Sequence, residues 1–184
     1  MGILLANDID NYGGGVGLEE NEMKWRMKLT ADYARNSFFG IEDGLVSTAG
    51  VMFGVATATT DRAFVLTVGM VTVLVEATSM GIGAYLSEKS ANEVEKRVTV
   101  KPVVDGILMF LTYSLAGTYC VSPYGIFGTR VGMYVSVLMT LGALFLLGYL
   151  PRKSTRRGLE VFMLGGLAVL IGYFAGGILS KLVF

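Results

Sequence analysis

Residues 63–86 read AFVLTVGMVTVLVEATSMGIGAYL, a run of membrane-spanning length that carries one carboxylate, Glu76, near its middle. An α-helix needs about 20 apolar residues to cross the hydrocarbon core of a bilayer. A charge at that depth costs at least a few kcal/mol, so it is rare unless it faces a partner or a pathway. Met80 follows Glu76 by one helical turn and shares its face. A hard oxygen beside a soft thioether indicates a site for a transition-metal ion.

Four further apolar runs of similar length fill most of the remaining chain, at residues 41–59, 103–121, 131–150 and 159–179. Of the 184 residues, 53% are hydrophobic and only 16% are charged, whereas about a quarter are charged in a soluble domain. The sequence therefore predicts an all-α integral membrane protein with five transmembrane helices, in one transporter domain over residues 23–184. Residues 1–22 are polar, acidic and glycine-rich, so we expect a flexible tail with no signal peptide.

Basic residues predict the orientation of these helices. Twelve of the fifteen Lys and Arg residues precede the first span or lie in the connections between spans two and three and between spans four and five. Only Arg62, Arg130 and Lys181 lie on the other side. By the positive-inside rule, the N terminus is cytoplasmic and the C terminus is outside or lumenal.

The chemistry available to the chain is narrow. There is no histidine, and Cys120 is the one cysteine, which we expect to be a small buried hydrophobe. Histidine metal sites and histidine proton relays are therefore excluded, and carboxylates must carry any metal or proton chemistry. No nucleophile–base set or phosphate loop is present, so we expect neither enzymatic activity nor a resident cofactor.

Helical spacing groups the candidate residues into two polar stripes. In the first span, Asp32, Asn36 and Asp43 fall at i, i+4 and i+11, which places them on one face, whereas Glu42 points about 100° away. In the second span, Thr72, Glu76, Met80 and Gly83 form a similar stripe. If these stripes face each other, they line a polar path into the membrane. The candidate residues for the entrance and the proton path are Asp32, Asn36, Glu42 and Thr72. Asp105 and Glu160 begin spans three and five, where capping of the helix dipole is the simpler interpretation.

Other sequence signals predict the connections and the packing. A tight turn is expected at 59–62, a start of helix three at Pro102, an outward turn at 122–125 and an end of helix four before Pro151. The charged segment 87–101 is expected to extend helix two into the cytoplasm; its Glu88, Glu93 and Glu95 form either a solvated face or a metal-capture patch. Three glycine pairs four residues apart, 40/44, 50/54 and 172/176, permit close helix approach and make a homodimer plausible.

Two sequence elements resemble the vacuolar iron transporter family: Asp43-Gly-Leu-Val-Ser-Thr in span one and Ser79-Met80-Gly-Ile-Gly-Ala-Tyr85-Leu in span two. The resemblance covers about residues 32–179, including the Arg157-Gly-Leu-Glu160 start of span five. It implies a five-helix homodimer that moves ferrous iron, and often manganese, out of the cytoplasm in exchange for protons. It also implies that Asp43 and Met80 are metal ligands and that the pathway lies at the dimer interface.

The chain departs from the family pattern at specific positions. Asp32 matches an acidic position at the cytoplasmic entrance, but Asn36 stands where the family has a carboxylate. Thr72 occupies the acidic position of span two, and Glu76 is interpreted as its carboxylate relocated by one turn. The link between spans two and three is short, so the chain resembles a form without the large cytoplasmic metal-binding domain of plant members.

These observations predict a homodimeric secondary transporter that exports Fe²⁺, and also Mn²⁺, with Asp43, Glu76 and Met80 as metal ligands. Its expected location is the plasma membrane of a prokaryote or a vacuole-type membrane of a eukaryote. Two alternatives stay open: a transporter of the same fold with a different solute, and a non-transporting structural or accessory membrane protein. No nucleic-acid partner is expected.

Overall fold

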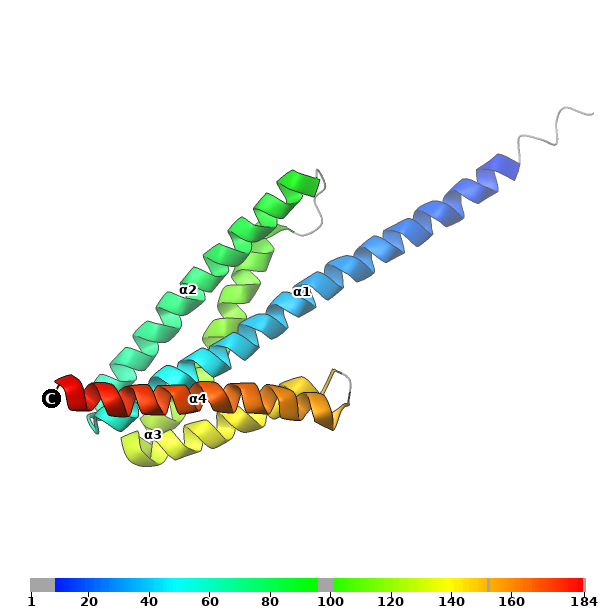
Figure 1. Cartoon of the computed structure of the whole chain (residues 1–184). Helices are drawn as coiled ribbons and strands as arrows, with labels where there is room; N and C mark the ends of the chain where they lie inside the picture. Colours follow the sequence, from blue (N-terminus) through cyan, green and yellow to red (C-terminus); the bar gives the residue numbers. More distant parts are fainter. Residues whose placement is uncertain (1–8, 96–100, 152, 184) are drawn as a thin grey trace, which may run out of the picture.

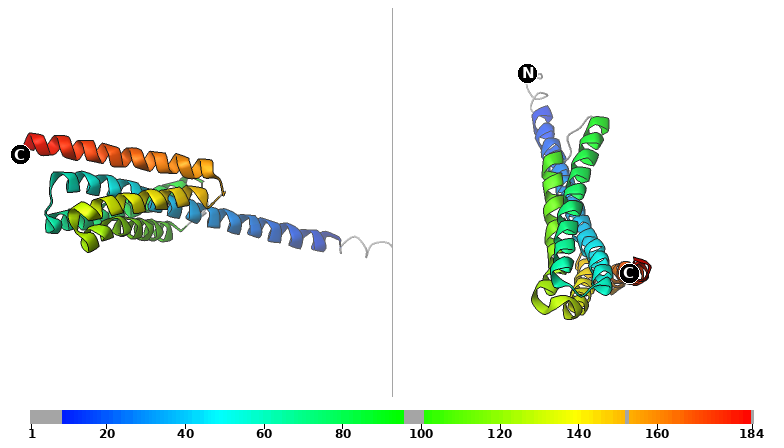
Figure 2. Two further views of the ribbon diagram at one scale, coloured as in Figure 1. Left: turned by 90° about the horizontal axis from the view of Figure 1, so that it is seen from below. Right: turned by 90° about the vertical axis from the view of Figure 1, so that its left-hand side faces the viewer.

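The computed structural model describes residues 9–95, 101–151 and 153–183. All its regular structure is helical, in α1 (Ile9–Ala58), α2 (Arg62–Glu95), α3 (Pro102–Tyr149) and α4 (Thr155–Val183). The first part of α3 packs against both α1 and α2, and α4 crosses this group at an angle (Figures 1 and 2). Each helix contains a segment long and apolar enough to cross a membrane. The all-helical membrane class is therefore confirmed.

The described residues form four helices rather than the predicted five, because the spans expected at 103–121 and 131–150 both belong to α3. Gly128 leaves the helical conformation, with φ of +77°, which glycine adopts at little cost because it has no Cβ. The two arms of α3 on either side of it fold back on each other. The Ser136 hydroxyl donates a hydrogen bond to the Cys120 carbonyl at 2.6 Å, and the Thr140 hydroxyl lies 3.2 Å from the Cys120 sulfur.

The turn predicted at 122–125 is wrong, because the helix continues through Pro123 and reverses only at Gly128. A proline inside a helix cannot donate to the carbonyl four residues earlier. Here that carbonyl belongs to Tyr119, and it accepts a hydrogen bond of 2.9 Å from the Ser122 hydroxyl instead. The Ser122 hydroxyl thus satisfies the carbonyl that Pro123 leaves without a backbone donor, and the helix continues to Gly128.

The other predicted boundaries agree with the structure. The turn between α1 and α2 falls at 59–61, where Asp61 accepts hydrogen bonds from the backbone N–H groups of Ala63 and Phe64. Pro102 begins α3, and α3 ends two residues before Pro151. α2 extends to Glu95, as the charged link predicted.

α1 begins at Ile9, within the segment 1–22 that was expected to be a flexible tail. Residues 1–8 lie outside the described part of the chain. Leucine, glutamate and methionine at positions 18–23 are good helix formers, so α1 extends toward the N terminus beyond the first apolar span despite its glycines.

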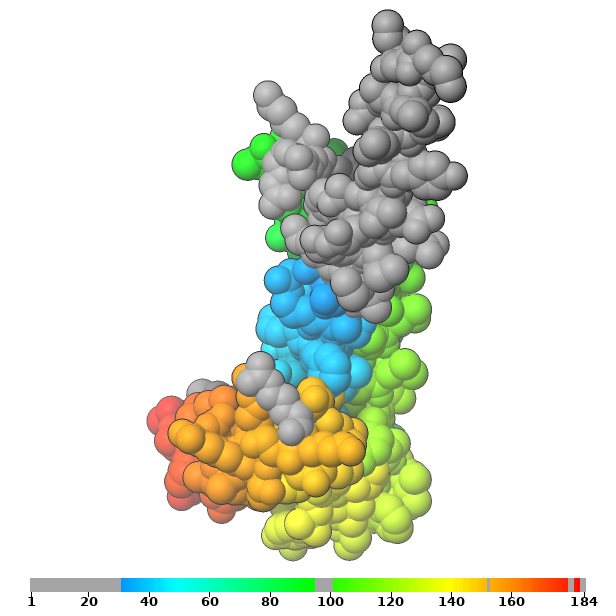
Figure 3. Space-filling model, turned by 90° about the vertical axis from the view of Figure 1, so that its right-hand side faces the viewer, coloured from blue at the N-terminus to red at the C-terminus, as the bar shows by residue number. Residues whose placement is uncertain are grey.

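Close helix contacts fix the register of the first three helices. α1 and the first arm of α3 run parallel, because Gly40 lies against Met109 and Gly44 lies against Tyr113. Figure 3 shows α1 and α3 side by side on one face of the molecule. A Cβ added to Gly44 would lie 2.8 Å from the Tyr113 carbonyl oxygen, so the backbones can approach only because this residue is glycine.

The second set of glycines joins α1 to α4. A Cβ at Gly172 would lie 2.0 Å from the Gly50 carbonyl oxygen, and a Cβ at Gly176 would lie 2.2 Å from that of Gly54. The predicted packing role of these pairs is therefore confirmed. These three pairs are used for packing within one chain.

We predict that Gly172→Leu destabilises the fold, because a leucine side chain cannot fit against the α1 backbone. Overpacking of this kind costs about 1–3 kcal/mol or more. The measurement is thermal unfolding of the purified protein in detergent. Gly142→Leu is the matched control, since a Cβ at Gly142 meets nothing within 4 Å. Equal unfolding temperatures for the two variants would contradict the packing.

Candidate metal site

Glu76 lies at a junction of three helices. The Ser47 hydroxyl of α1 donates a hydrogen bond of 2.9 Å to Glu76 Oε2, and the Tyr113 hydroxyl of α3 donates to the same oxygen. The Ser47 and Tyr113 hydroxyl oxygens also lie within hydrogen-bonding distance of each other, and each hydroxyl has one proton to donate. Tyr113 is fully buried, whereas Ser47 and Glu76 are half-buried. The carboxylate of α2 is thus held by neutral donors from both neighbouring helices.

Helical register explains why these side chains meet. Along α2, Val73, Ala77 and Gly81 are buried, and Gly81 and Val73 contact α3. Thr72, Glu76 and Met80 each precede one of these buried residues, so they form a half-buried stripe beside the packed one.

The same arrangement recurs on α1. Gly44 and Thr48 are buried against α3, and Asp43 and Ser47 precede them. Asp43 is half-buried and lies close enough to Glu76 for the two charges to interact. The structure therefore brings Asp43 of the predicted α1 stripe near Glu76 of the α2 stripe, whereas Asn36 of the same α1 stripe contacts Asp105 of α3.

The geometry leaves coordination capacity unused. Both hydroxyl groups donate to Oε2 of Glu76, so its Oε1 remains available to bind a metal ion or a proton. Two neighbouring carboxylates in a medium of low polarity repel each other unless a cation or a proton lies between them. Within the described ranges no three Cys, Asp or Glu side chains cluster tightly enough to hold a metal alone. A complete ligand set therefore needs further ligands, such as the Met80 sulfur, water molecules or residues of a second chain.

The residues predicted at the entrance take different positions. Asp32 is paired with Arg35 on the next turn of α1 at 3.9 Å, and Glu42 is half-buried. Asn36 donates its side-chain amide to both oxygens of Asp105, at 2.8 Å each. Thr72 lies in the same stripe as Glu76 and Met80.

Asp105 does not cap α3, contrary to the interpretation from sequence. Lys101 is the N-cap residue, it makes no side-chain capping bond, and the carboxylate of Asp105 turns inward to Asn36. Only 1% of Asp105 is exposed. The helix contact at Gly106 encloses the first turn of α3, and this tertiary contact is absent from the local sequence signal.

The acidic residues of the α2 end lie apart from this junction. Glu88 is half-buried and Glu93 is exposed, and both belong to the last turns of α2. The side chain of Glu95 lies outside the described residues. Metal capture by these three glutamates stays a prediction.

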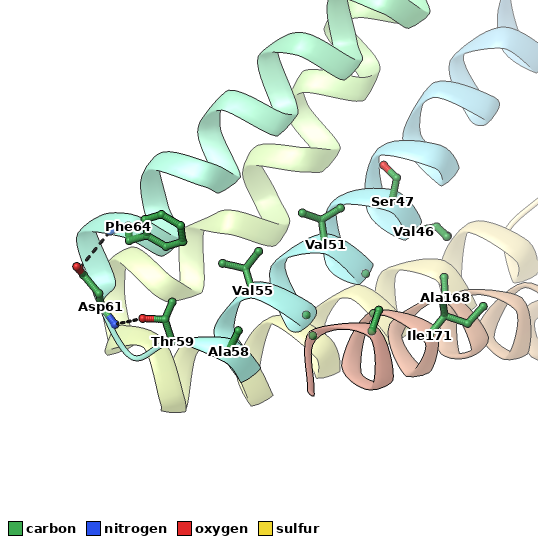
Figure 4. Close-up of a pocket in the computed structure, with 15 residues that line it drawn as sticks. Val46, Ser47, Val51, Val55, Ala58, Thr59, Asp61, Phe64, Ala168 and Ile171 are labelled. Atoms are coloured by element: carbon green, nitrogen blue, oxygen red, sulfur yellow. Dashed lines mark hydrogen bonds between the residues drawn. The ribbon is translucent and has the colours of Figure 1, made fainter. Parts of the chain in front are cut away.

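An apolar groove of about 890 Å³ begins at Ser47, which also donates to Glu76. Figure 4 shows the residues that line it. Ser47 lines it together with residues of α1 and α4 whose side chains are small or apolar, among them Gly50, Gly54, Ala168 and Gly172. At its other end it reaches Asp61 and Phe64, near the α1–α2 turn.

Sequence reasoning missed Ser47 and Tyr113. Ser47 follows Asp43 by one turn, so helical spacing could have found it. Tyr113 could not be found in this way, because its place opposite Glu76 depends on the register of α1 and α2 against α3.

Apolar helices of membrane-spanning length with ionisable groups buried between them define a multi-pass integral membrane protein. The chain belongs to the VIT family, whose sequence profile matches residues 34–101 and 93–177. It is 28% identical to vacuolar iron transporter 1 of Eucalyptus grandis over 182 residues, which cover 89% of this chain and 73% of that protein. It is also 22% identical to an uncharacterized protein of Methanocaldococcus jannaschii over 165 residues, 78% of this chain and 84% of that protein. The resemblance seen in the sequence is thus confirmed.

We predict that Tyr113→Phe destabilises the protein by about 1.5–3 kcal/mol, the range for a hydrogen bond to a charged group. The substitution keeps the ring packing and removes only the hydroxyl. The measurement is a double-mutant cycle with Glu76→Gln, read by unfolding in detergent. Additive effects of the two substitutions would show that the hydroxyl and the carboxylate do not interact.

Proposed function

We propose that this protein is a secondary transporter that moves divalent transition-metal ions out of the cytoplasm in exchange for protons. The observation that carries the proposal is the placement of Glu76, held by Ser47 and Tyr113 beside Asp43 at the junction of α1, α2 and α3. Membership of the VIT family and the similarity to a vacuolar iron transporter support the same function.

The proposed ligands have complementary roles. Asp43 and Glu76 supply charged oxygens that offset the charge of a divalent ion, and Met80 supplies a thioether. Ca²⁺ and Mg²⁺ bind oxygen ligands almost exclusively, whereas Fe²⁺ and other transition ions accept softer ligands. The combination therefore favours Fe²⁺, and Mn²⁺ after it, over Ca²⁺ and Mg²⁺. The metal ion is the transported substrate and not a resident cofactor.

Proton exchange follows from the same carboxylates. A carboxylate binds a metal ion in its deprotonated form, so metal binding releases any proton that the group carries. Asp43 and Glu76 lie close enough to influence each other, and a proton is the natural replacement when the metal ion leaves.

We propose five membrane crossings from the four helices. A straight helix of 48 residues would be about 72 Å long, more than twice the roughly 30 Å of hydrocarbon that it has to cross. α3 folds back at Gly128, so each of its arms makes one crossing. The α1–α2 turn then lies at the same end of the molecule as the C terminus (Figure 1). The basic segments at the opposite end support a cytoplasmic location for that end.

A homodimer is part of the proposal. The stripe of Thr72, Glu76 and Met80 is only half-buried in one chain, and most of α2 is exposed. A second copy over this face would shield the site from lipid and complete the ligand set. Asp32 and Glu42 on α1 and the glutamates of the α2 end would then line the cytoplasmic approach.

Two other functions are distinguished by experiment. A transporter for a different solute would show no flux of Fe²⁺ or Mn²⁺ and no competition by either ion. An accessory membrane protein, in which Glu76 merely joins three helices, would show no metal-dependent shift in unfolding temperature.

The proposed location of the transporter is the plasma membrane in a prokaryote and a vacuole-type membrane in a eukaryote.

We predict that Glu76→Gln and Met80→Leu each abolish Fe²⁺ flux into proteoliposomes while leaving a folded protein. The first substitution removes a charged ligand and the second removes a sulfur ligand, and both keep the side-chain volume nearly unchanged. The measurement is metal uptake reported by an internal dye under reducing conditions.

The matched controls are Glu160→Gln and Met163→Leu, which make the same changes at exposed positions of α4. Flux in these variants should equal that of the unmodified protein. Unimpaired transport by both Glu76→Gln and Met80→Leu would rule out the proposed site.

We also predict that metal binding weakens as the pH is lowered. The carboxylates bind metal only when deprotonated, so affinity is full at neutral to alkaline pH and falls as protons occupy Asp43 and Glu76. The measurement is the Mn²⁺-dependent shift in unfolding temperature across a pH series. A shift that stayed constant from neutral to acidic pH would contradict carboxylate ligation.

A further inference from the structure

The structure contains a second buried carboxylate, separate from the proposed metal ligands. Asp105 is 1% exposed and lies in the first turn of α3. The Asn36 side-chain amide of α1 lies 2.8 Å from each of its oxygens.

Close helix packing encloses this carboxylate. Gly106 contacts the backbone of Gly81 on α2 and the side chain of Tyr85, and a Cβ at Gly106 would lie 2.8 Å from the Gly81 carbonyl oxygen. On the α1 side, the Tyr33 hydroxyl accepts a hydrogen bond from the Lys101 backbone N–H at 3.2 Å. Because Asp105 is enclosed in this way, a proton is the ligand that its carboxylate can take up with the least rearrangement of the packing.

Among the described residues, no positive side chain forms an ion pair with Asp105. Arg35 of α1 is exposed and pairs with Asp32. The titratable and charged groups on the neighbouring turns are Asp32, Tyr33 and Arg35 on α1, Tyr85 and Glu88 on α2, and Lys101 on α3. A fully buried carboxylate without a cation is costly as an anion and is therefore stabilised by taking up a proton.

We propose that Asp105 is the proton-binding residue that couples proton movement to metal transport; this rests on the proposed function. Asn36 is suited to the role, because an amide carries both donors and an acceptor. Its NH₂ group donates to the carboxylate, and its carbonyl oxygen can accept from the protonated acid. A basic partner would hold Asp105 permanently charged, whereas the amide serves both states.

With this assignment, the metal ion and the proton bind at two different sites. Asp43, Glu76 and Met80 bind the metal ion, and Asp105 takes up and releases a proton nearer to the α2–α3 link. It also gives a physical role to asparagine at position 36, where a carboxylate would repel the charge of Asp105.

The test compares Asp105→Asn with unmodified protein in proteoliposomes that carry a pH-sensitive dye and a metal-sensitive dye. We expect Asp105→Asn to lose metal-driven proton flux by about tenfold or more, a change typical of a coupling free energy. Its affinity for Mn²⁺, read by unfolding temperature, should stay within about twofold, since the metal ligands are intact. Asp61→Asn is the matched control, because Asp61 is exposed and asparagine can replace it as a helix cap.

A second measurement does not depend on transport. Infrared difference spectra between acidic and alkaline pH should show a carboxylic-acid C=O band that Asp105→Asn removes and Asp61→Asn leaves. If Asp105→Asn does not fold, the exchange Asn36→Asp with Asp105→Asn keeps one carboxyl and one amide in contact and should retain the band.

Three results would overturn the assignment: unchanged proton flux in Asp105→Asn, an unchanged C=O band, or a loss of Mn²⁺ affinity as large as the loss of proton flux. Absence of metal flux in the unmodified protein would instead refute the proposed function. In that case the infrared spectra still decide whether Asp105 binds a proton.

Discussion

The need to satisfy polar groups inside the hydrocarbon determines how these helices are arranged. A carboxylate at this depth must find donors or a cation within the protein, because the bilayer supplies neither. Glu76 obtains two hydroxyl donors from α1 and α3, and Asp105 obtains the amide of Asn36. The bonds around Glu76 and those around Asp105 each join α1 to α3, at two different heights along the helices. Together they fix the register of α1 against the first arm of α3.

Glycine makes these short polar bonds possible. The Ser47 and Asn36 side chains are short, and they reach their partners only where the helix backbones approach closely. Gly40 and Gly44 provide that approach between α1 and α3, and Gly81 with Gly106 provides it between α2 and α3. Close packing therefore comes first, and the position of each buried charge follows from it. The groove beside Ser47 lies where α1 and α4 separate from α2.

The sequence predicted much of this arrangement for clear physical reasons. Long apolar runs report membrane helices directly, and helical periodicity placed Glu76 and Met80 on one stripe and Asp43 on another. Contacts that depend on tertiary register were not visible: Tyr113 looked like one more aromatic residue of an apolar helix, and Asp105 looked like a cap. The turn predicted at 122–125 was wrong for a related reason. Ser122 satisfies the carbonyl that Pro123 leaves without a donor, so α3 continues as a helix to Gly128.

In the proposed function, α1 and α2 hold one metal ion between Asp43, Glu76 and Met80. The decisive measurement is an experimental structure of the protein soaked with Mn²⁺ or Fe²⁺, recorded at a wavelength where the metal scatters anomalously. We expect one anomalous peak between the half-buried stripes of the two helices, within bonding distance of a carboxylate oxygen from each, and its loss in Glu76→Gln. A peak elsewhere in the membrane region, with no density at this junction, would rule out this ligand set.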